Sequence, residues 1–276
     1  MKIETLAQQL FFSTIRIETQ TARGRGTGTG FIFSFERAGQ MMLFLVTNKH
    51  VVAGAHTGKF FFTESDGTEP LIGKRYDIEM DNFEWRWHGH PIADIDITIM
   101  PLVPVLKEIE KAGKRVFFKA LPHTLIPTTE QVNDLDAIEE VLFIGYPSGI
   151  FDQKNLMPLA RRGMTATPLQ IDYEGKPIFL IDASVFPGSS GSPVLICNTG
   201  GYASKGGFVV GNRVFFLGVI AEVAFREEQG QIDFVSIPTA EVPIVKTRQM
   251  IDIGVVFKAS TVVEAIEDFL KKRPTS

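Results

Sequence analysis

The chain reads Phe186-Pro187-Gly188-Ser189-Ser190-Gly191-Ser192-Pro193-Val194-Leu195 where a turn rich in glycine and serine enters an apolar run. Glycine permits tight turns in which neighbouring backbone amides converge on one point. Converging amides form an oxyanion hole, which an attacking serine hydroxyl needs beside it. In the pattern G-x-S-G-x-P the serine before the second glycine is the candidate nucleophile. This serine is Ser190, and the N–H groups of Gly188 and Ser190 are the candidate oxyanion donors.

A serine nucleophile needs a base that takes its proton and an acid that orients the base. Of the five histidines, only His50 directly ends a buried-looking strand. Asp96 opens the apolar segment Ile97–Pro101, where it could be buried against an imidazole. Asp94 lies two residues earlier on the same alternating face, so it is the alternative acid. The Asp-Ile-Thr-Ile pattern favours Asp96.

The rest of the chain carries short segments rich in β-branched and aromatic residues, bounded by glycine, proline, asparagine or aspartate. Such segments are typical of β-strands, and about eleven of them suit two small barrels. The predicted strands are Thr14–Glu18, Gly30–Phe35, Met42–Thr47, Phe60–Thr63, Ile97–Pro101, Val141–Gly145, Ala160–Ala166, Ile178–Ile181, Pro193–Ile196, Val214–Ile220 and Ile253–Phe257.

Two segments depart from this β pattern. Pro104–Gly113 predicts a helical turn or two and begins the connection 106–136, in which we place the domain boundary. Ala259–Lys272 predicts a closing amphipathic helix, because its apolar residues recur at helical spacing and lysines fill the last turn. Thr261 and Glu264 match the spacing of a capping box at the start of this helix.

Together these segments resemble the trypsin/chymotrypsin superfamily of serine peptidases, most closely its disulfide-free HtrA-type bacterial branch. The order histidine, aspartate, serine is that of the superfamily. The gaps of 46 and 94 residues between the three are close to those of compact members. Gly26–Ile32 resembles the glycine-rich segment that precedes the histidine loop. Ile253–Phe257, with the helix after it, resembles the end of an HtrA protease domain, so the resemblance spans residues 10–272.

The resemblance implies an all-β fold of two packed six-stranded antiparallel barrels (chymotrypsin-like) with a C-terminal α-helix. Residues 1–120 would form the N-terminal barrel carrying His50 and Asp96. Residues 121–276 would form the C-terminal barrel carrying Ser190 and the closing helix. The function implied is a serine endopeptidase that works through an acyl-enzyme.

The resemblance also locates substrate-binding residues. The floor of the S1 pocket, which receives the P1 side chain before the cleaved bond, falls on Ser184. Because Ser184 is not an acid, arginine or lysine at P1 is disfavoured. Ala221, Glu222 and Val223 would line the substrate backbone, and Val223 stands where large pockets often keep glycine. A small or medium apolar P1 residue is therefore expected.

Regulation is expected to differ from that of the digestive enzymes. Those enzymes carry an aspartate at the position of Ser189, and it pairs with a newly cut N-terminus. Serine cannot make that ion pair, so activation by N-terminal cleavage is not expected. We do not expect a PDZ domain after residue 276. We therefore expect any regulation to act through the protein's own loops, such as the long loop or hairpin 225–247, or through a regulatory protein partner.

Composition excludes several other classes of protein. The net charge of −4 provides no positive field that would collect nucleic acid or anionic lipid. The single cysteine, Cys197, cannot form an intramolecular disulfide, and the N-terminus lacks the apolar region of a signal peptide. No apolar run reaches the roughly 18 residues of a membrane helix. We expect a cytoplasmic protein that acts on protein or peptide substrates, without nucleic acid, membrane, metal or cofactor.

Other interpretations of single motifs are weaker. His88, His90 and Asp94 could ligate a metal, but a histidine pair at i, i+2 beside one acid is a weak signal, and we favour loop residues. The segment Arg23–Gly30 lacks the pattern of a phosphate-binding loop. Two functional alternatives stay open. One is a catalytically silent scaffold or binding protein of this fold, and the other is a protease that is inactive until a partner orders its active-site loops.

Overall fold

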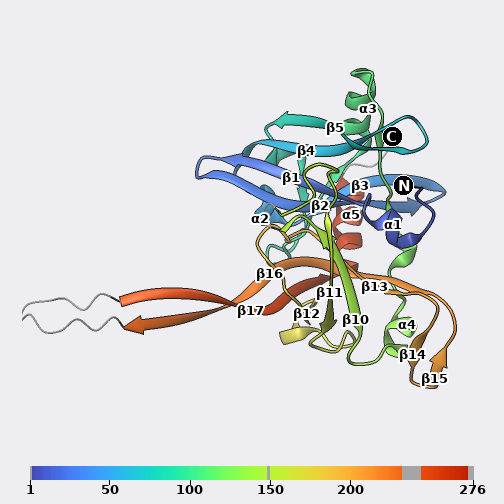
Figure 1. Ribbon diagram of the computed structural model, residues 1–276, viewed down its shortest axis with the longest axis vertical. Coiled ribbons are helices and arrows are strands. Elements are labelled where there is room, and N and C mark those ends of the chain that lie inside the picture. Colours follow the sequence, from blue (N-terminus) through green and yellow to red (C-terminus); the bar gives the residue numbers. More distant parts are fainter. Residues whose placement is uncertain (1, 148–149, 232–243, 273–276) are drawn as a thin grey trace, which may run out of the picture.

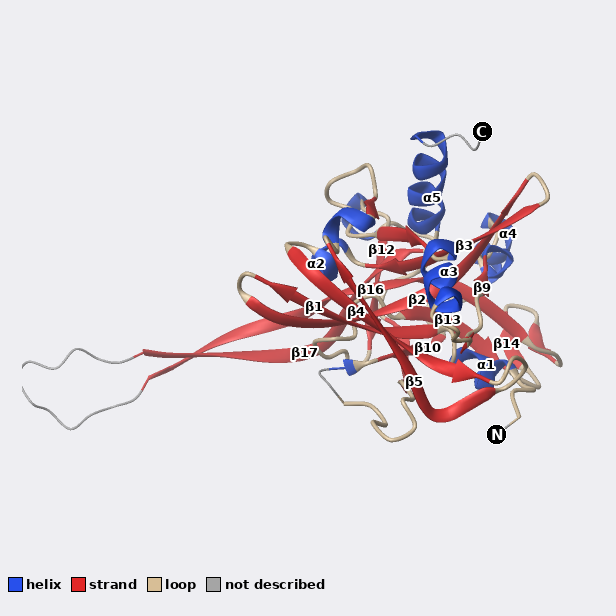
Figure 2. Cartoon of the chain, turned by 90° about the horizontal axis from the view of Figure 1, so that it is seen from above, coloured by secondary structure: helices blue, strands red, loops and turns tan. Residues whose placement is uncertain are grey.

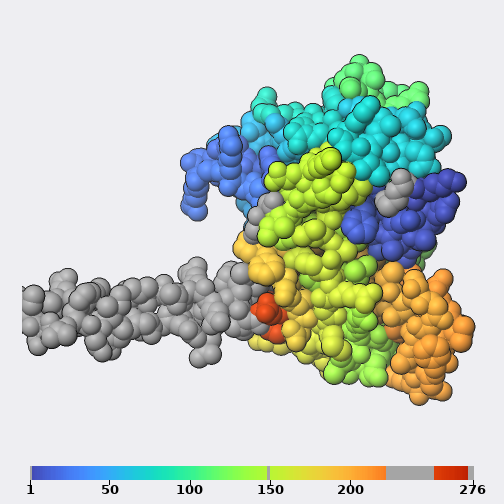
Figure 3. Space-filling view, in the orientation of Figure 1, coloured from blue at the N-terminus to red at the C-terminus, as the bar shows by residue number. Residues whose placement is uncertain are grey.

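The computed structural model of the 276-residue chain describes residues 2–147, 150–231 and 244–272, with 222–231 and 244–251 described as backbone. It is built mostly of β-strands, with short helices at the edges and a longer helix at the C-terminal end, which confirms the predicted fold class (Figures 1 and 2). In the space-filling view the first half of the chain, blue to cyan, packs on the second half, yellow to orange (Figure 3).

Strands of the first half form a nine-stranded sheet in the order β5-β4-β1-β2-β3-β7-β6, with β8 paired to β4 and β9 to β2. Neighbours along this order are antiparallel, whereas β9 runs parallel to β2. The strands are β1 (Thr14–Thr21), β2 (Gly24–Arg37), β3 (Gln40–Thr47), β4 (Ala55–Ser65), β5 (Pro70–Asp81), β6 (His88–Gly89), β7 (Thr98–Pro101), β8 (Val116–Phe117) and β9 (Leu121–Pro122).

Six strands of the second half close into the predicted antiparallel barrel, in the order β10-β11-β12-β17-β16-β13. A separate hairpin, β14-β15, extends from it. The strands are β10 (Glu140–Gly145), β11 (Leu159–Thr165), β12 (Ile178–Asp182), β13 (Pro193–Asn198), β14 (Tyr202–Ser204), β15 (Gly207–Val209), β16 (Arg213–Gln231) and β17 (Ile244–Lys258). We propose a domain boundary near residue 120, between the strands of the two sheets. Strand β9 lies beyond this boundary but pairs with β2 of the first sheet.

The helices are short except at the C-terminal end. They are α1 (Leu6–Leu10), α2 (Lys49–Val52), α3 (Val103–Lys111), α4 (Thr129–Asp134) and α5 (Ser260–Lys272). The predicted helices near residues 104–113 and 259–272 are confirmed as α3 and α5. Within the described residues no helix is both long enough and apolar enough to cross a membrane.

The capping box predicted at the start of α5 is wrong. Thr261 lies inside the helix, and its hydroxyl donates to the carbonyl of Lys258 at 2.7 Å. Glu264 instead receives a hydrogen bond from the ring of His90 at 3.1 Å. The spacing of a capping box was present, but the helix begins one residue before Thr261, so its hydroxyl faces a carbonyl rather than the free amides of the first turn.

The loop or hairpin expected at 225–247 has paired arms. Strands β16 and β17 continue past the barrel, with Phe225 opposite Met250 and Gln231 opposite Ile244. Figure 1 shows the two arms leaving the barrel as a long ribbon. The middle of the predicted segment, 232–243, lies outside the described residues.

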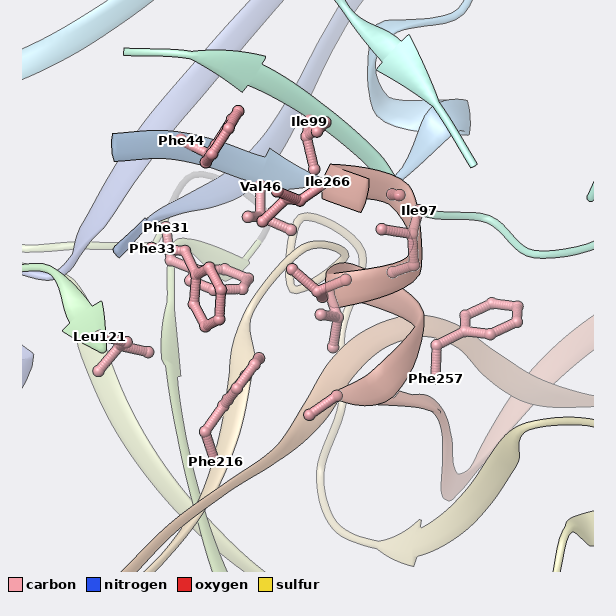
Figure 4. Packing of buried hydrophobic residues seen from close by; sticks show 14 of the residues in the cluster. Phe31, Phe33, Phe44, Val46, Ile97, Ile99, Leu121, Phe216, Phe257 and Ile266 are labelled. Carbon is pink, nitrogen blue, oxygen red and sulfur yellow. The ribbon is translucent and has the colours of Figure 1, made fainter. Parts of the chain in front are cut away.

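One hydrophobic cluster joins the two halves. The fully buried ring of Phe216 on β16 packs against Phe31 and Phe33 on β2, with ring centroids 5.3 and 5.8 Å away. Ile266 of α5 lies beside Val46 in the same cluster (Figure 4). The alternating strands thus bury one face of each sheet in a shared core, which fixes how the two halves meet.

Replacing Phe216 by alanine is expected to lower the free energy of unfolding by about 3–5 kcal/mol, because a large buried ring is lost and a cavity remains. The matched control is Phe208→Ala. Phe208 is 73% exposed on β15, so its loss should change stability by no more than about 0.5 kcal/mol. Urea unfolding of both variants measures the difference. Equal losses would mean that Phe216 does not join the halves as described.

Candidate active site

His50 lies in α2, the single helical turn that follows strand β3. Its Nδ1 is 2.5 Å from Oδ2 of Asp96, and its backbone N–H donates to Oδ1 of the same carboxylate at 3.0 Å. Both carboxylate oxygens of Asp96 therefore contact His50. This contact fixes the orientation of the imidazole and directs its Nε2 edge away from the acid.

Asp96 is itself held in place. The side-chain amide of Asn48 donates to its carbonyl oxygen at 2.8 Å. The ammonium of Lys49 donates to the carbonyls of Ile92 and Ala93 in the loop that leads to Asp96, at 2.9 and 3.2 Å. Burial lowers the pKa of this ammonium, while the charges of Asp96 and Asp94 act in the opposite direction. The two residues before His50 thus anchor the loop that carries the acid.

The alternative acid, Asp94, is exposed and lies on that loop without contacting His50. The structure brings Asp96 to the imidazole, as the Asp-Ile-Thr-Ile pattern predicts. Strand alternation alone would not separate two acids two residues apart, because both lie on the same face, and it is the contact with His50 that distinguishes Asp96.

Ser190 lies in the turn between Pro187 and Gly191. Its hydroxyl donates to the carbonyl of Ala221 at 3.1 Å. Ala221 is at an irregularity where the pairing of β16 with β17 shifts between Ile220 and Glu222. Such a bulge leaves one residue out of the ladder and re-aims its peptide groups. That accounts for a carbonyl of β16 facing the Ser190 side chain.

Thr29 on β2 ties the Ser190 turn to the first sheet. Its N–H donates to the carbonyl of Ser190 at 2.9 Å, and its hydroxyl donates to the carbonyl of Gly188 at 3.0 Å. The Thr29 carbonyl accepts a 2.7 Å hydrogen bond from the hydroxyl of Thr47, three residues before His50. A continuous chain of hydrogen bonds therefore connects the end of β3 to the serine turn. Sequence reasoning singled out the segment Gly26–Ile32 but assigned no role to Thr29 within it.

In the described part of the chain no hydrogen bond joins His50 directly to Ser190. The serine hydroxyl is engaged with Ala221 instead. His50 is half-exposed, with 48% of its side chain open to solvent, so its ring can approach a substrate. Rotation about the Cα–Cβ bond of Ser190 is the motion that would release its hydroxyl from the Ala221 carbonyl.

The candidate oxyanion donors lie in the same turn. Gly188 and Gly191 both have φ of +86°, the left-handed region that favours glycine. Across residues 2–147, 150–231 and 244–272, neither the Gly188 nor the Ser190 amide donates a hydrogen bond. A Cβ at Gly191 would lie 1.9 Å from the Thr29 carbonyl oxygen. The second glycine of the motif is thus required by a backbone contact between the two halves.

The other substrate-side predictions fall near this turn. Ser184 is exposed, and its carbonyl accepts a hydrogen bond from Arg161. Ala221 is buried and accepts from Ser190. Glu222 and Val223 continue along β16, paired with Val255 and Gly254, and their side chains lie outside the described part. The residue that sequence reasoning missed here is Arg161.

The alternative metal site is occupied by other contacts. His88 Nε2 lies 2.7 Å from Asp268, and His90 Nε2 lies 3.1 Å from Glu264, both acids on α5. The N–H of Ile92 donates to His90 Nδ1, so His90 is neutral with its proton on Nε2. Among the residues that the structure describes, no group of three or more His, Cys, Asp or Glu side chains could hold a metal. The two histidines fasten the terminal helix to the first sheet.

Comparison with known protein families identifies the family of this chain. The trypsin-like peptidase domain matches residues 28–201, which include His50, Asp96 and Ser190. The chain belongs to the trypsin-like peptidase family. The resemblance to this superfamily that the sequence indicates is thus confirmed at the level of the family. No curated protein sequence matches it.

Solved structures with the same fold are distant in sequence. The HtrA-type protease AlgW with tripeptide is 13% identical with a TM-score of 0.51, and the match covers 96% of this chain but 62% of AlgW. The serine endoprotease from Yersinia pestis is 15% identical over 98% of this chain and 68% of that one, with a TM-score of 0.46. The scabies mite inactivated protease paralogue S-I1 is 16% identical over 96% of each chain, with a TM-score of 0.48. The chain thus spans less than two thirds of the length of AlgW.

Proposed function

We propose that this trypsin-like peptidase is a serine endopeptidase with Ser190 as nucleophile, His50 as base and Asp96 as the acid that orients it. The observation that carries the proposal is the two-pronged contact of Asp96, whose two oxygens meet the ring and the backbone N–H of His50. A carboxylate that grips an imidazole in this way holds Nδ1 protonated and leaves Nε2 free to accept a proton.

The reaction would follow from these positions. Ser190 Oγ attacks the substrate carbonyl while His50 Nε2 takes its proton, and the N–H groups of Gly188 and Ser190 stabilise the oxyanion. The imidazolium then protonates the leaving amine, which departs as the acyl-enzyme forms. Water, deprotonated by His50, attacks the ester; the bond to Ser190 Oγ breaks as His50 returns the proton to that oxygen, and the acid is released. These steps need no metal or cofactor.

Fluorophosphonate labelling tests the proposal. These probes react rapidly only with a serine whose base is aligned, so the purified full chain should be labelled on Ser190, and Ser190→Ala should not be labelled. A silent scaffold of the same fold would give no labelling under any condition. A protease that awaits a partner would be labelled only after the partner is added.

We propose a small or medium apolar P1 residue, because Ser184 places no acid at the position expected for the S1 floor. Digestion of a peptide library should therefore yield cleavages after residues such as alanine, valine or leucine, read out by mass spectrometry. A profile dominated by arginine, lysine, aspartate or glutamate at P1 would contradict this assignment.

We also propose that the enzyme works in the cytoplasm on protein or peptide substrates, with its own loops or a protein partner as the means of control. The chain's one cysteine, Cys197, supports a compartment in which thiols stay reduced. Burial raises the pKa of the Cys197 thiol, so at neutral pH it stays protonated and unreactive.

A further inference from the structure

Arg161 projects from β11 to the loop that leads into the nucleophile. Its Nη1 donates to the carbonyl of Ser184 at 3.0 Å, and its Nη2 donates to the hydroxyl of Ser189 at 2.8 Å. One guanidinium thus bridges both ends of the segment 184–189. Arginine suits such a bridge because its donors form a rigid planar fork.

The surroundings of this guanidinium make its burial costly. One face lies over the ring of Phe143, 4.5 Å from the centroid, on the neighbouring strand β10. Burial lowers the pKa of Arg161 to about 10, so the half-buried group keeps its charge at neutral pH while losing part of its contact with water. Its Nε is buried with no hydrogen-bond partner in the described part of the chain. The two bonds to the loop, together with the aromatic face, are what offset that cost.

Ser189 is the residue between the two candidate oxyanion donors, Gly188 and Ser190, and it is fully buried. Its hydroxyl accepts from Arg161 and from the N–H of Phe186 at 3.3 Å, and its own N–H donates to the Phe186 carbonyl at 2.9 Å. The turn is therefore closed around the Ser189 side chain. Moving that side chain would rotate the peptide groups on both sides of it, and these carry the two candidate donors.

We propose that Arg161 is a positioning residue for the oxyanion hole: its guanidinium anchors Ser184 and Ser189 to strand β11 so that the amides of Gly188 and Ser190 converge. This inference rests on the proposed function of Ser190. Activation by a newly cut N-terminus is not expected at this loop, and Arg161 supplies a cation to it from within the chain. The loop is thereby held in place without an external activating event.

The test compares Arg161→Met with Arg162→Met. Arg162 is the next residue of β11, but 78% of its side chain is exposed and it makes a surface ion pair with Glu140, so it controls for loss of a charge on the strand. With a peptide chosen from the library, R161M should lower kcat about 10- to 100-fold with KM within about twofold, since the oxyanion donors act in the transition state. R162M should match the wild type. Arg161→Lys should recover part of the loss, because it restores one donor.

An inhibitor pair separates a positioning role from general damage. A peptide aldehyde adds to the serine and places an oxygen in the oxyanion hole, whereas the corresponding peptide alcohol binds without reacting. R161M should weaken the aldehyde by the same factor as kcat and leave the alcohol unchanged. Ser189→Ala, which keeps Arg161 in place, should show the same pattern. The double variant should lose no more than R161M alone, since both act through one contact.

Two results would overturn the inference. One is equal activity of R161M and R162M, and the other is a rise in KM confined to peptides with aspartate or glutamate at P1, which would make Arg161 a substrate-reading residue. If R161M does not fold, as judged by thermal melting, S189A decides by the same readouts. Failure of the proposed function itself is distinct, because the wild type would then react with fluorophosphonate no faster than Ser190→Ala.

Discussion

Replacing Ser190 by alanine is expected to lower kcat for peptide hydrolysis by about 10⁴- to 10⁶-fold, because the attacking oxygen is removed. The residual rate would come from substrate binding and the oxyanion amides. Initial-rate measurements with a cleaved peptide give the number. The variant loses one hydrogen bond, from the hydroxyl to the Ala221 carbonyl, so its thermal stability should stay close to that of the wild type.

Ser204→Ala is the matched control for this experiment. Ser204 is exposed at the end of β14, in the hairpin β14-β15 that is separate from the barrel sheet, and its replacement should leave kcat and KM unchanged. An S190A enzyme with undiminished kcat would remove Ser190 from the mechanism. The nucleophile would then have to be sought among the other serines of the 186–195 segment.

Replacing Asp96 by asparagine is expected to lower kcat by about 10⁴-fold while leaving the fold intact. Asparagine keeps the shape of the side chain, and its oxygen can still accept from the His50 backbone. Its amide group, however, would face Nδ1 as a donor and stabilise the tautomer whose proton sits on Nε2. Such an imidazole cannot take the proton of Ser190. Steady-state kinetics and circular dichroism of the variant test both halves of this expectation.

Asp94→Asn is the corresponding control, because it removes the same charge two residues away from an exposed side chain. Its kcat should stay within about twofold of the wild type, since one exposed charge contributes little to a neighbouring site. If D94N and D96N were equally impaired, the contact between His50 and Asp96 would not be the source of activity. If neither were impaired, the base would need no acid to orient it.

Much of the candidate site could be predicted from sequence because its residues lie in segments with strong local constraints. Ser190 sits between glycines that must adopt positive φ, and Asp96 opens a buried strand with alternating apolar residues. Much of the barrel of the second half could be predicted as well, since β10, β12 and β13 are short apolar runs with clear ends. In each case the signal is carried by neighbours in the chain.

The parts that could not be predicted depend on contacts between distant segments. Arg161 lies in no motif, and Thr29 lies in a glycine-rich segment that does not reveal its contacts; the partners of these two residues are 28 and 159 positions away. The first sheet has nine strands rather than six because β6, β8 and β9 are two-residue segments, too short for any alternation to show. The capping box failed because α5 begins one residue before Thr261, and Glu264 instead contacts His90, a residue 174 positions earlier.

The hydrogen bonds of Thr29 mean that residues of both sheets shape the turn that carries Ser190. The peptide groups around Ser190 are held by a threonine that belongs to the other half of the molecule. Residues beyond about 120 are therefore not expected to form an active enzyme on their own. A change in one half that alters this contact has to be compensated by a change in the other half. A substitution that displaces Thr29 is therefore expected to disturb the Ser190 turn in the other half.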